Sequence, residues 1–380
     1  MKVALFTDTY LPQINGVTNT LSNLINYFES SGIDYKIFVP KYDIDIQDQN
    51  IERFHSIKFI FYPENRLAIP NKSRIHSILS EFQPDIIHIM TEFNLGLAGL
   101  NYGKSHDIPV FTNYTTNFSQ YTDYYKINFL KQPLWNYLKW FHTQSDLTLC
   151  PSEEARRVLH MHGIHNTAIF SRGIDFNGFH PRNRTSELRH KLGIEDKIAF
   201  LYVGRVSFEK DLDILCKSYQ KIRQTYKERV AMIITGDGPY LEKCKQMFPK
   251  DTIFTGYKKG KDLKELYASC DIFTFPSSTE TFGNVVLEAM ASGIPVIGAD
   301  AGGVGEIIKH RVTGLKFAER NADQLAKYMA ELIENYDLNE YLKTNGREYS
   351  INRSWEKIFN GLMEHYSKIL TGKGSCSISA

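Results

Sequence analysis

The chain has 380 residues, about twice the length of a typical single domain, and this length predicts two domains of similar size. Hydrophobic residues make up 42% of it and charged residues 23%, a balance typical of a globular protein. Lys and Arg total 45 against 43 Asp and Glu, so no global basic field would attract nucleic acid. We therefore expect no nucleic-acid partner.

The sequence also indicates a cellular compartment. No apolar run approaches the ~18–20 residues that cross a bilayer, and the apolar start at 3–6 turns polar at Thr7, too early for a secretory signal. The 5 cysteines form no Cys-x-x-Cys pair, which argues against a disulfide framework or a zinc site. We expect a cytoplasmic protein without a metal site that touches a membrane, if at all, from its inner face.

Strands alternating with helices organise the first half of the sequence. Short apolar segments, each followed by a polar turn, predict strands at 3–6, 35–39, 58–61, 86–89, 110–111 and 147–149, with a helix at 20–28. This alternation is typical of βαβ units and of a parallel sheet covered by helices on both faces.

A second series of the same kind begins after the polar stretch 181–186. Its predicted strands are 198–203, 231–235, 252–254, 272–275 and 296–297. We therefore predict an α/β fold with two doubly wound, Rossmann-like domains, joined by a linker between Gly173 and Leu192. The predicted divisions are domains at 1–180 and 190–352, a C-terminal helix at 353–370 that returns to the first domain, and a flexible tail at 371–380.

The turns that follow the strands are where such sheets bind ligands, because backbone amides and the positive ends of helices collect there. The richest of these turns contains Gly283, which lets the backbone approach a ligand closely. A helix is predicted to begin near Val285, leaving the amides of Asn284, Val285 and Val286 free to bind an anion. This pattern indicates a phosphate cradle.

Two carboxylates, Glu280 and Glu288, bracket this cradle. They resemble the acid–base pair of a glycosidase, but eight helical positions span up to ~12 Å, whereas glycosidase carboxyls lie ~5–9.5 Å apart. Two separate roles fit better, one carboxylate for a sugar and the other for a ribose diol. Spacing alone supports equally well the interpretation that neither is functional. Glu280 would then be a solvated loop residue and Glu288 a charge on a helix face.

A second turn begins at Gly204, after the first strand of the second series. Arg205 and Lys210 flank a strand end and a helix start, a place suited to neutralising a diphosphate, although most Arg and Lys side chains are surface cations. Asp211 and Asp213 have the spacing of a metal-binding Asp-x-Asp, but acidic residues are expected at a helix start from capping and the helix dipole.

Four further features are weaker. The tight turn at Gly236 is mostly structural, and the glycine cluster at 302–305 suggests backbone donors at a ligand. The segment 15–18, which contains Gly16, is interpreted as a flexible loop before a helix. His88 lies in an apolar run and is predicted to be a core residue rather than a ligand.

Together these segments resemble the large retaining glycosyltransferase family of GT-B architecture that includes phosphatidylinositol mannosyltransferases and sucrose-phosphate synthase. Glu280-x7-Glu288 resembles its Glu-x7-Glu motif, and Gly204-Arg205 with Glu209-Lys210 its Gly-Arg and Glu-Lys segment. The first domain is most similar to the branch with sulfoquinovosyl-diacylglycerol synthases and lipid-directed mannosyltransferases. Other matching segments are 6–12, 15–17, 84–88, 149–152, 172–175, 236–239 and 291–296.

The resemblance implies two Rossmann-like domains that face a central cleft. It implies a metal-independent transfer, without a cofactor, of a hexose from a UDP- or GDP-linked sugar to a hydroxyl acceptor such as a membrane glycolipid or cell-envelope precursor. As catalytic residues, Arg205 and Lys210 would bind the diphosphate and Glu280 would contact the donor sugar. Glu288 would hold the ribose hydroxyls. The other implied substrate-binding residues are Gly16, Thr115, Gly204, Gly236, Phe282, Gly283, Asn284 and Val285.

One position departs from the family pattern. Thr115 stands where many relatives carry a histidine beside the transferred sugar, and this leaves the donor undetermined. Bond cleavage builds negative charge on the leaving diphosphate. Preorganised cations and amides stabilise that charge, and each contributes ~10²–10³ in rate. Retaining members of the family are thought to let that phosphate deprotonate the acceptor on the same face.

The acceptor is the least determined feature. Lys and aromatic residues interleave at 124–131 in a pattern that suits a membrane interface, whereas we interpret the helix beginning at Pro133 as a core helix. Two alternatives share the architecture: a nucleotide-sugar epimerase and a non-catalytic nucleotide-sugar binder. A phosphorylase would need a pyridoxal lysine site, which we do not identify.

Overall fold

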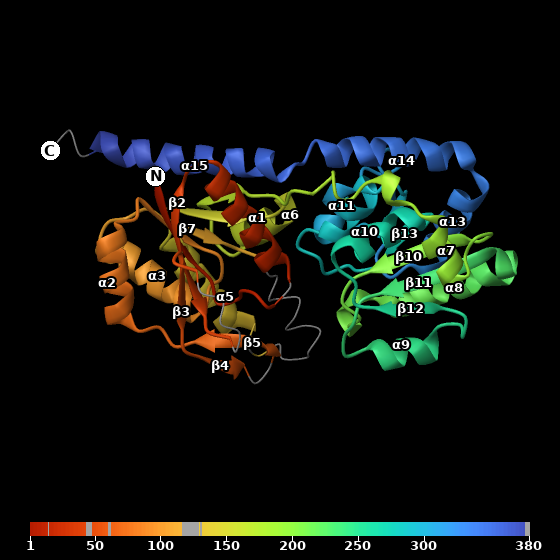
Figure 1. Ribbon diagram of the computed structural model, residues 1–380, viewed down its shortest axis with the longest axis horizontal. Helices are drawn as coiled ribbons and strands as arrows, with labels where there is room; N and C mark the ends of the chain where they lie inside the picture. The colour runs from red at the N-terminus through yellow and green to blue at the C-terminus, as the bar shows by residue number, and fades with distance from the viewer. Residues whose placement is uncertain (14, 43–47, 60–61, 116–128, 130, 377–380) are drawn as a thin grey trace. The chain divides into compact units, whose positions relative to one another are not determined.

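The computed structural model describes residues 1–13, 15–42, 48–59, 62–115, 129 and 131–376 (Figure 1). Of these, 58–59, 62–65 and 373–376 are described by their backbone alone. The chain divides into two compact units. The first comprises Met1–Arg172 and the segment from Glu356 onward, and the second comprises Gly173–Trp355.

The first unit contains a parallel sheet of seven strands in the order β3-β2-β1-β6-β7-β8-β9. Its strands are β1 (Lys2–Phe6), β2 (Asp34–Pro40), β3 (Ile51–Phe54), β6 (Ile86–Ile89), β7 (Val110–Asn113), β8 (Leu147–Cys150) and β9 (Thr167–Ile169). The helices are α1 (Gly16–Ser30), α2 (Lys72–Phe82), α3 (Asn94–Ser105), α5 (Lys131–Thr143), α6 (Glu153–Met161) and α15 (Trp355–Cys376).

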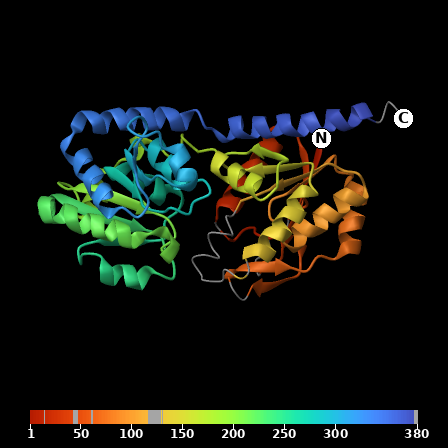
Figure 2. The ribbon, with the colours of Figure 1, turned by 180° about the vertical axis from the view of Figure 1, so that it is seen from behind.

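Successive residues of β6 point to opposite faces of this sheet, as the pleat requires. Ile87 and Ile89 pack in one core cluster with Leu95 and Leu100 of α3. The orange and yellow helices α2, α3 and α5 cover that face, which is turned toward the viewer in Figure 2. His88, between the two isoleucines, points to the other face, where α15 lies.

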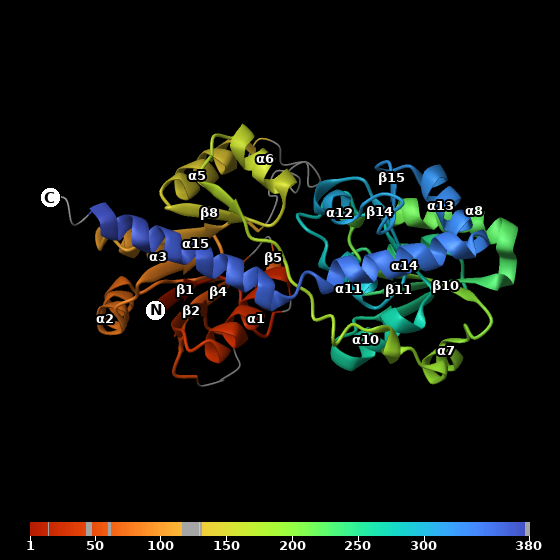
Figure 3. The same ribbon diagram turned by 90° about the horizontal axis from the view of Figure 1, so that it is seen from above.

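His88 is fully buried, as predicted for a core residue. Its Nε2 lies 3.0 Å from Asn113 Oδ1, an acceptor, so Nε2 carries the proton and Nδ1 accepts from the Tyr366 hydroxyl at 2.5 Å. Burial lowers the pKa of His88 to about 4, which keeps the ring neutral. These bonds attach α15 to the middle of the sheet, which it crosses in Figure 3.

Helix α1 begins earlier than predicted. The segment 15–18 is its cap and first turn rather than a flexible loop. The Asn15 side chain accepts hydrogen bonds from the amides of Val17 and Thr18, and the Thr18 hydroxyl oxygen accepts from the Asn15 amide. This reciprocal capping box satisfies amides that a helix end otherwise leaves unpaired, so the helix starts at Gly16.

The strand predicted at 58–61 does not join the parallel sheet. Its described part belongs to β4 (Ser56–Phe59), which pairs antiparallel with β5 (Tyr62–Ala68) in a separate two-stranded sheet. Residues 60–61 lie outside the described residues. An alternating apolar pattern identifies a strand but not its partner, so the parallel assignment was wrong.

The second unit contains a parallel sheet of six strands in the order β12-β11-β10-β13-β14-β15. Its strands are β10 (Ile198–Val203), β11 (Val230–Thr235), β12 (Ile253–Gly256), β13 (Ile272–Phe275), β14 (Val296–Ala299) and β15 (Leu315–Phe317). Its α-helices are α7 (Ser186–Leu192), α8 (Leu212–Tyr226), α9 (Leu241–Met247), α10 (Gly260–Ser269), α11 (Asn284–Ala291), α12 (Gly302–Ile307), α13 (Ala322–Glu334) and α14 (Tyr336–Ile351). Three short 3₁₀ turns are η2 (Pro181–Asn183), η3 (Phe208–Lys210) and η4 (Lys227–Arg229).

Helices cover both faces of this sheet. Leu201 pairs with Phe273 in the register of β10 and β13, so Phe200 and Phe273 point to opposite faces. The Phe200 ring contacts Tyr219 of α8, whereas the Phe273 ring contacts Tyr267 of α10. The doubly wound architecture predicted for this unit is therefore confirmed.

Much of the predicted linker is folded onto the second unit. Arg189 of α7 is buried and donates to the Ser269 carbonyl at 2.8 Å and to Asp271 at 3.0 Å. Arg184 also pairs with Asp271, at 2.9 Å. The polar composition of this stretch predicts a linker because it contains these arginines, yet both arginines bind Asp271 of the second unit.

The C-terminal helix is longer than predicted. The predicted helix is 353–370, whereas α15 spans Trp355–Cys376 and so includes residues 371–376, which the sequence assigns to a flexible tail. Residues 377–380 lie outside the described residues. In the described part of the chain, no helix has the length and apolar character needed to span a bilayer.

Candidate active site

The predicted site residues of the second unit lie at one edge of its sheet. Gly204 and Arg205 follow β10, Gly236 follows β11, and the segment 276–288 follows β13. These three strands are neighbours and run parallel, so their carboxyl ends meet at the same edge.

Glycines bring two of these turns into direct backbone contact. Gly236 has φ +135°, and a Cβ placed there would lie 1.9 Å from the Gly204 carbonyl oxygen. The Gly204 amide donates to the Thr235 carbonyl, and the Gly236 amide donates to the Gly256 carbonyl, both at 3.0 Å. The turns after β10, β11 and β12 are thus tied in series, which fixes the backbone that carries Arg205.

Replacing Gly236 by alanine should destabilise the protein by about 2–4 kcal/mol, because the new methyl group meets backbone and the φ angle is unfavourable. Gly256→Ala is the matched control: Gly256 also has a left-handed φ, +68°, but nothing lies within 4 Å of its Cβ. We expect about 1–2 kcal/mol there. Urea unfolding measures both, and equal losses would contradict the close approach.

A hydrogen-bonded pair of turns positions Lys210. The Ser207 hydroxyl donates to Glu209 at 2.6 Å, and the Thr279 hydroxyl donates to the Glu209 carbonyl at 3.2 Å. The Ser278 hydroxyl donates to the Asp211 carboxylate at 2.8 Å. These buried contacts join η3 to the loop after β13.

Lys210 and Glu280, both predicted to be catalytic, contact each other. Lys210 Nζ lies 2.6 Å from Glu280 Oε1, with the lysine side chain 11% exposed and the carboxylate 27% exposed. The exposed part of this ion pair is the part that a ligand can reach. Arg205 is half-buried on the neighbouring turn, where its carbonyl accepts from the Tyr202 hydroxyl at 2.9 Å.

The glycines at 302–303 hold the loop that carries Glu280. The Gly303 amide donates to the Glu280 carbonyl at 2.8 Å. A Cβ on Gly302 would lie 2.4 Å from that same carbonyl oxygen, and one on Gly303 would lie 2.4 Å from Phe282 Cα. The prediction that this glycine cluster supplies donors to a ligand is therefore wrong for Gly303, whose amide is used within the protein.

The segment predicted to form a phosphate cradle lies at the start of α11. Gly283 caps the helix with φ +98°, and the helix begins at Asn284. The amides of Asn284 and Val285 belong to the first turn and have no carbonyl one turn earlier in the helix. Val286, expected to be free, donates to the Gly283 carbonyl at 3.0 Å. The cradle thus offers fewer amides than predicted.

In this segment the Phe282 ring and the side-chain oxygen of Asn284 are both buried. Phe282 is 6% exposed and belongs to the core of the unit, so its ring packs inside the protein and only its backbone is placed to meet a substrate. Asn284 Oδ1 is buried and has no hydrogen-bond partner among the described residues. A buried acceptor without a partner is unusual, because leaving it unpaired costs free energy.

Glu288, one turn further along α11, occupies a different environment. The Tyr267 hydroxyl donates to Glu288 Oε2 at 2.8 Å. Burial is the largest influence on this carboxyl and raises its pKa to about 7, while the Tyr267 hydrogen bond and the Lys264 charge act in the opposite direction. Glu280 and Glu288 therefore have separate partners on separate elements, as two separate roles require.

Sequence reasoning missed Tyr267 and misinterpreted Asp211. Tyr267 gives no signal, because it reaches Glu288 only through the packing of α10 against α11. Asp211 was expected to cap α8, but its side chain makes no cap hydrogen bond and binds Ser278 instead. Asp213 pairs with Lys217 on the surface of α8 at 3.5 Å. Among the described residues, no three His, Cys, Asp or Glu side chains are grouped as metal ligands.

Gly16 and Thr115 belong to the first unit, in the segments that follow β1 and β7. Gly16 is the exposed first residue of α1, and Thr115 is half-buried. At the same edge, Asp8 is buried and accepts from the amides of Leu95 and Gly96 at the start of α3. Burial raises the pKa of Asp8 to about 7. Sequence reasoning missed this carboxylate, which anchors α3.

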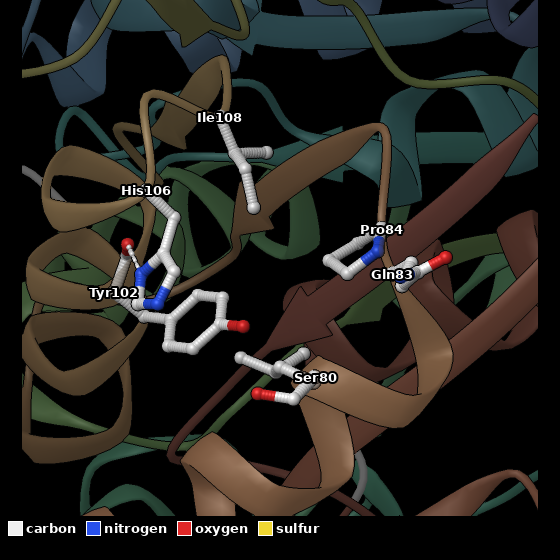
Figure 4. A pocket seen from close by; sticks show the side chains of 7 residues that line it. Ser80, Gln83, Pro84, Tyr102, His106 and Ile108 are labelled. Carbon is white, nitrogen blue, oxygen red and sulfur yellow. Dashed lines mark hydrogen bonds between the residues drawn. The ribbon is translucent and has the colours of Figure 1, made fainter.

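A pocket of about 380 Å³ lies at the opposite edge of the first unit (Figure 4). Pro84 and Ile108, which line it, precede β6 and β7, so it sits at the amino ends of these strands. The rings of Tyr102 and His106 stack there at 4.0 Å, and His106 Nδ1 is bonded to the Tyr102 carbonyl at 3.0 Å. None of the predicted site residues lines it, so the pocket is not the predicted site.

Both halves of the chain match known families. Residues 184–349 match the family "Glycosyl transferases group 1", and residues 14–177 match "Glycosyltransferase Family 4". Sulfoquinovosyl transferase SQD2 of Arabidopsis thaliana is 30% identical over 372 residues, which cover 93% of this chain and 71% of the plant protein. Alpha-monoglucosyldiacylglycerol synthase of Streptococcus pneumoniae is 30% identical over 357 residues, which cover 90% of this chain and 80% of the bacterial synthase. GDP-mannose-dependent alpha-mannosyltransferase of Corynebacterium glutamicum is 29% identical over 380 residues, covering 97% and 89%.

Solved structures show the same fold. HepE of Anabaena in complex with UDP superposes with a TM-score of 0.79 at 19% identity, covering 97% of this chain and 100% of HepE. Sucrose-phosphate synthase of Thermosynechococcus elongatus also superposes with a TM-score of 0.79, at 17% identity. The match covers 98% of this chain and 99% of the synthase. The two Rossmann-like units are thus those of the GT-B fold. The chain belongs to the GT-B glycosyltransferase family of the branch that its sequence motifs indicate, and it is a glycosyltransferase.

Proposed function

We propose that this protein transfers a hexose, with retention of configuration and without a metal ion, from a UDP- or GDP-linked sugar to a hydroxyl acceptor. The observation that carries the proposal is the Lys210–Glu280 ion pair, held beside the start of α11 at the carboxyl edge of the second sheet. Relatives named as a GDP-mannose-dependent enzyme and a structure solved with UDP support a nucleotide-sugar donor.

The charges of the site suit a leaving diphosphate. Cleavage of the sugar–phosphate bond places negative charge on the phosphate oxygens. Lys210, Arg205 and the first amides of α11 supply fixed positive charge at the sheet edge where these oxygens would bind. Because cations and amides can do this work directly, the proposal requires no metal.

Glu280 is suited to the donor sugar rather than to the phosphate. Its carboxylate is bound to Lys210, so a negative charge stays close to the reacting carbon as that carbon becomes positive. Retention then follows if the departing phosphate takes the acceptor proton on the same face. In this proposal Glu288 binds the ribose, and Gly16 and Thr115 contribute from the first unit.

We propose a lipid or cell-envelope acceptor. Relatives named as sulfoquinovosyl transferase and monoglucosyldiacylglycerol synthase support this choice. On the first unit, Trp140 of α5 is 47% exposed and Met161 of α6 is 74% exposed, and Lys139 and Arg157 are also exposed on these helices. Apolar side chains next to cations suit an anionic membrane surface. Of the segment proposed from sequence, 124–128 and 130 lie outside the described residues.

A donor panel tests the proposal. The purified protein is incubated with UDP-glucose, UDP-galactose or GDP-mannose, with and without vesicles of diacylglycerol and anionic phospholipid. We expect one donor to raise the melting temperature and to release its nucleotide faster when vesicles are present. Stabilisation without release, in every combination, would indicate a nucleotide-sugar binder instead. Product anomer analysis by NMR tests retention, and EDTA tests the independence from metal.

A further inference from the structure

The carboxylate of Glu288 is held on one side by a fixed donor. Tyr267 lies on α10, is fully buried, and donates its hydroxyl proton to Glu288 Oε2 at 2.8 Å. Its ring packs edge-on against Phe179 at 5.6 Å and at a tilt against Phe273 at 5.7 Å. A ring clamped between two aromatic side chains cannot follow a moving carboxylate, so the hydroxyl sets where Glu288 points.

Tyr267 is the donor in this hydrogen bond and Glu288 is the acceptor. Burial and the neighbouring Glu288 charge raise the pKa of Tyr267 far above its usual value, so the hydroxyl stays protonated and acts as a donor. Lys264 of the same helix is bound to Asp175 at 2.8 Å, which holds its charge away from direct contact with the carboxylate. Burial and the charge of Glu288 also raise the pKa of Tyr257. Tyr267 is therefore the neutral group that orients Glu288.

We infer that Tyr267 is a positioning residue of the nucleoside site: by occupying Oε2 of Glu288 it turns Oε1 toward the ribose and makes the site select ribonucleotides over deoxyribonucleotides. This inference rests on the proposed function, in which Glu288 binds the ribose. A ribose hydroxyl that donates to an oriented, charged carboxylate gains more binding free energy than one that donates to a carboxylate free to rotate. The selectivity then depends on a tyrosine that does not itself touch the nucleotide.

Calorimetric titration with UDP, GDP and their 2′-deoxy and 3′-deoxy forms tests the role. In the wild-type protein we expect one ribonucleotide to bind about 10–100-fold more tightly than one of its deoxy forms, the range for a hydrogen bond to a charged group. Tyr267→Phe should lose most of this ratio. We expect its affinity for the ribonucleotide to fall and its affinity for the deoxynucleotide to stay nearly unchanged.

The matched control is Tyr219→Phe. Tyr219 is also fully buried, but it lies on α8 and its ring packs against Phe200 of β10, on the opposite face of the sheet from Tyr267. This variant should keep the wild-type ratio. A second variant, Phe179→Leu, keeps the Tyr267 hydroxyl and loosens its ring, so it should lower the ratio by a smaller factor. It also provides a test if Tyr267→Phe does not fold.

A pH profile separates orientation from simple packing. UDP-glucose is the probe, because its diphosphate is a diester and does not titrate near neutral pH. Affinity should fall on acidification, as Glu288 is protonated near pH 7. Donation from Tyr267 favours the charged form of Glu288, so Tyr267→Phe should raise the pH at which affinity falls. A wild-type ratio and an unchanged profile in Tyr267→Phe would overturn the inference alone. Wild-type protein that binds neither nucleotides nor UDP-glucose would overturn the proposed function and the inference with it.

Discussion

Replacing Lys210 by alanine is expected to lower the rate of glycosyl transfer by about 10²–10³-fold or more, the cost of removing one preorganised charge from a developing anion. The effect has two parts. The variant loses the cation nearest the proposed phosphate, and it leaves Glu280, now unpaired, to repel that phosphate. Nucleotide release at saturating donor measures the rate, and circular dichroism checks the fold.

A control for Lys210 is present on the same segment of chain. Lys217 pairs with Asp213 on the exposed surface of α8, at 3.5 Å. Lys217→Ala should leave both rate and stability almost unchanged, since exposed pairs contribute about 0–1 kcal/mol. If Lys210→Ala retained a rate within tenfold of wild type, the ion pair would have a structural role and the proposed leaving-group contact would be wrong.

Glu288→Gln is expected to weaken nucleotide binding and to stabilise the free protein above pH 7. The pKa of Glu288 is about 7 in the folded protein against 4.5 for the free side chain. A raised carboxyl pKa means that the stability contribution is full below pH 4.5 and is lost as pH rises through 7. At pH 8 the charge costs on the order of 3 kcal/mol, from the size of the shift. The neutral amide avoids that cost.

The two effects of Glu288→Gln have separate measurements. Melting temperatures at pH 8 and pH 5 should show the variant more stable than wild type at pH 8 and nearly equal to it at pH 5. Calorimetry at pH 8 should show a loss of nucleotide affinity of about 10–100-fold, because a charged acceptor is replaced by a neutral one. A variant that is less stable at pH 8 and binds nucleotide normally would contradict both the burial of the charge and its role.

The sequence predicted the features that depend on local pattern. Buried parallel strands are nearly continuous apolar runs, so the strands that carry the site in the second unit were found close to their observed bounds. Gly283 signalled the start of α11 because its left-handed backbone needs a glycine. Glu280 and Glu288 stood out by their spacing around that glycine.

Features that depend on packing between distant segments could not be predicted. Tyr267 is one buried aromatic residue among many until α10 packs on α11. Asp211 looks like a helix cap until the loop after β13 brings Ser278 to it. The strands β3 and β9 are short or half-buried and have no apolar run to reveal them. In each case the partner, rather than the local sequence, determines the role.

The hydrogen bond between His88 and Tyr366 has a consequence for synthesis of the chain. The first unit lacks one wall when it leaves the ribosome, because the helix that covers His88 follows the whole second unit in the sequence. The second unit is contiguous in sequence and can finish earlier. The amino-terminal half is therefore translated first and completed last, with a buried imidazole left uncovered until Tyr366 arrives. Premature termination shortly before residue 366 would remove the partner of His88 and leave the nascent first unit incomplete, a natural substrate for chaperones and proteases.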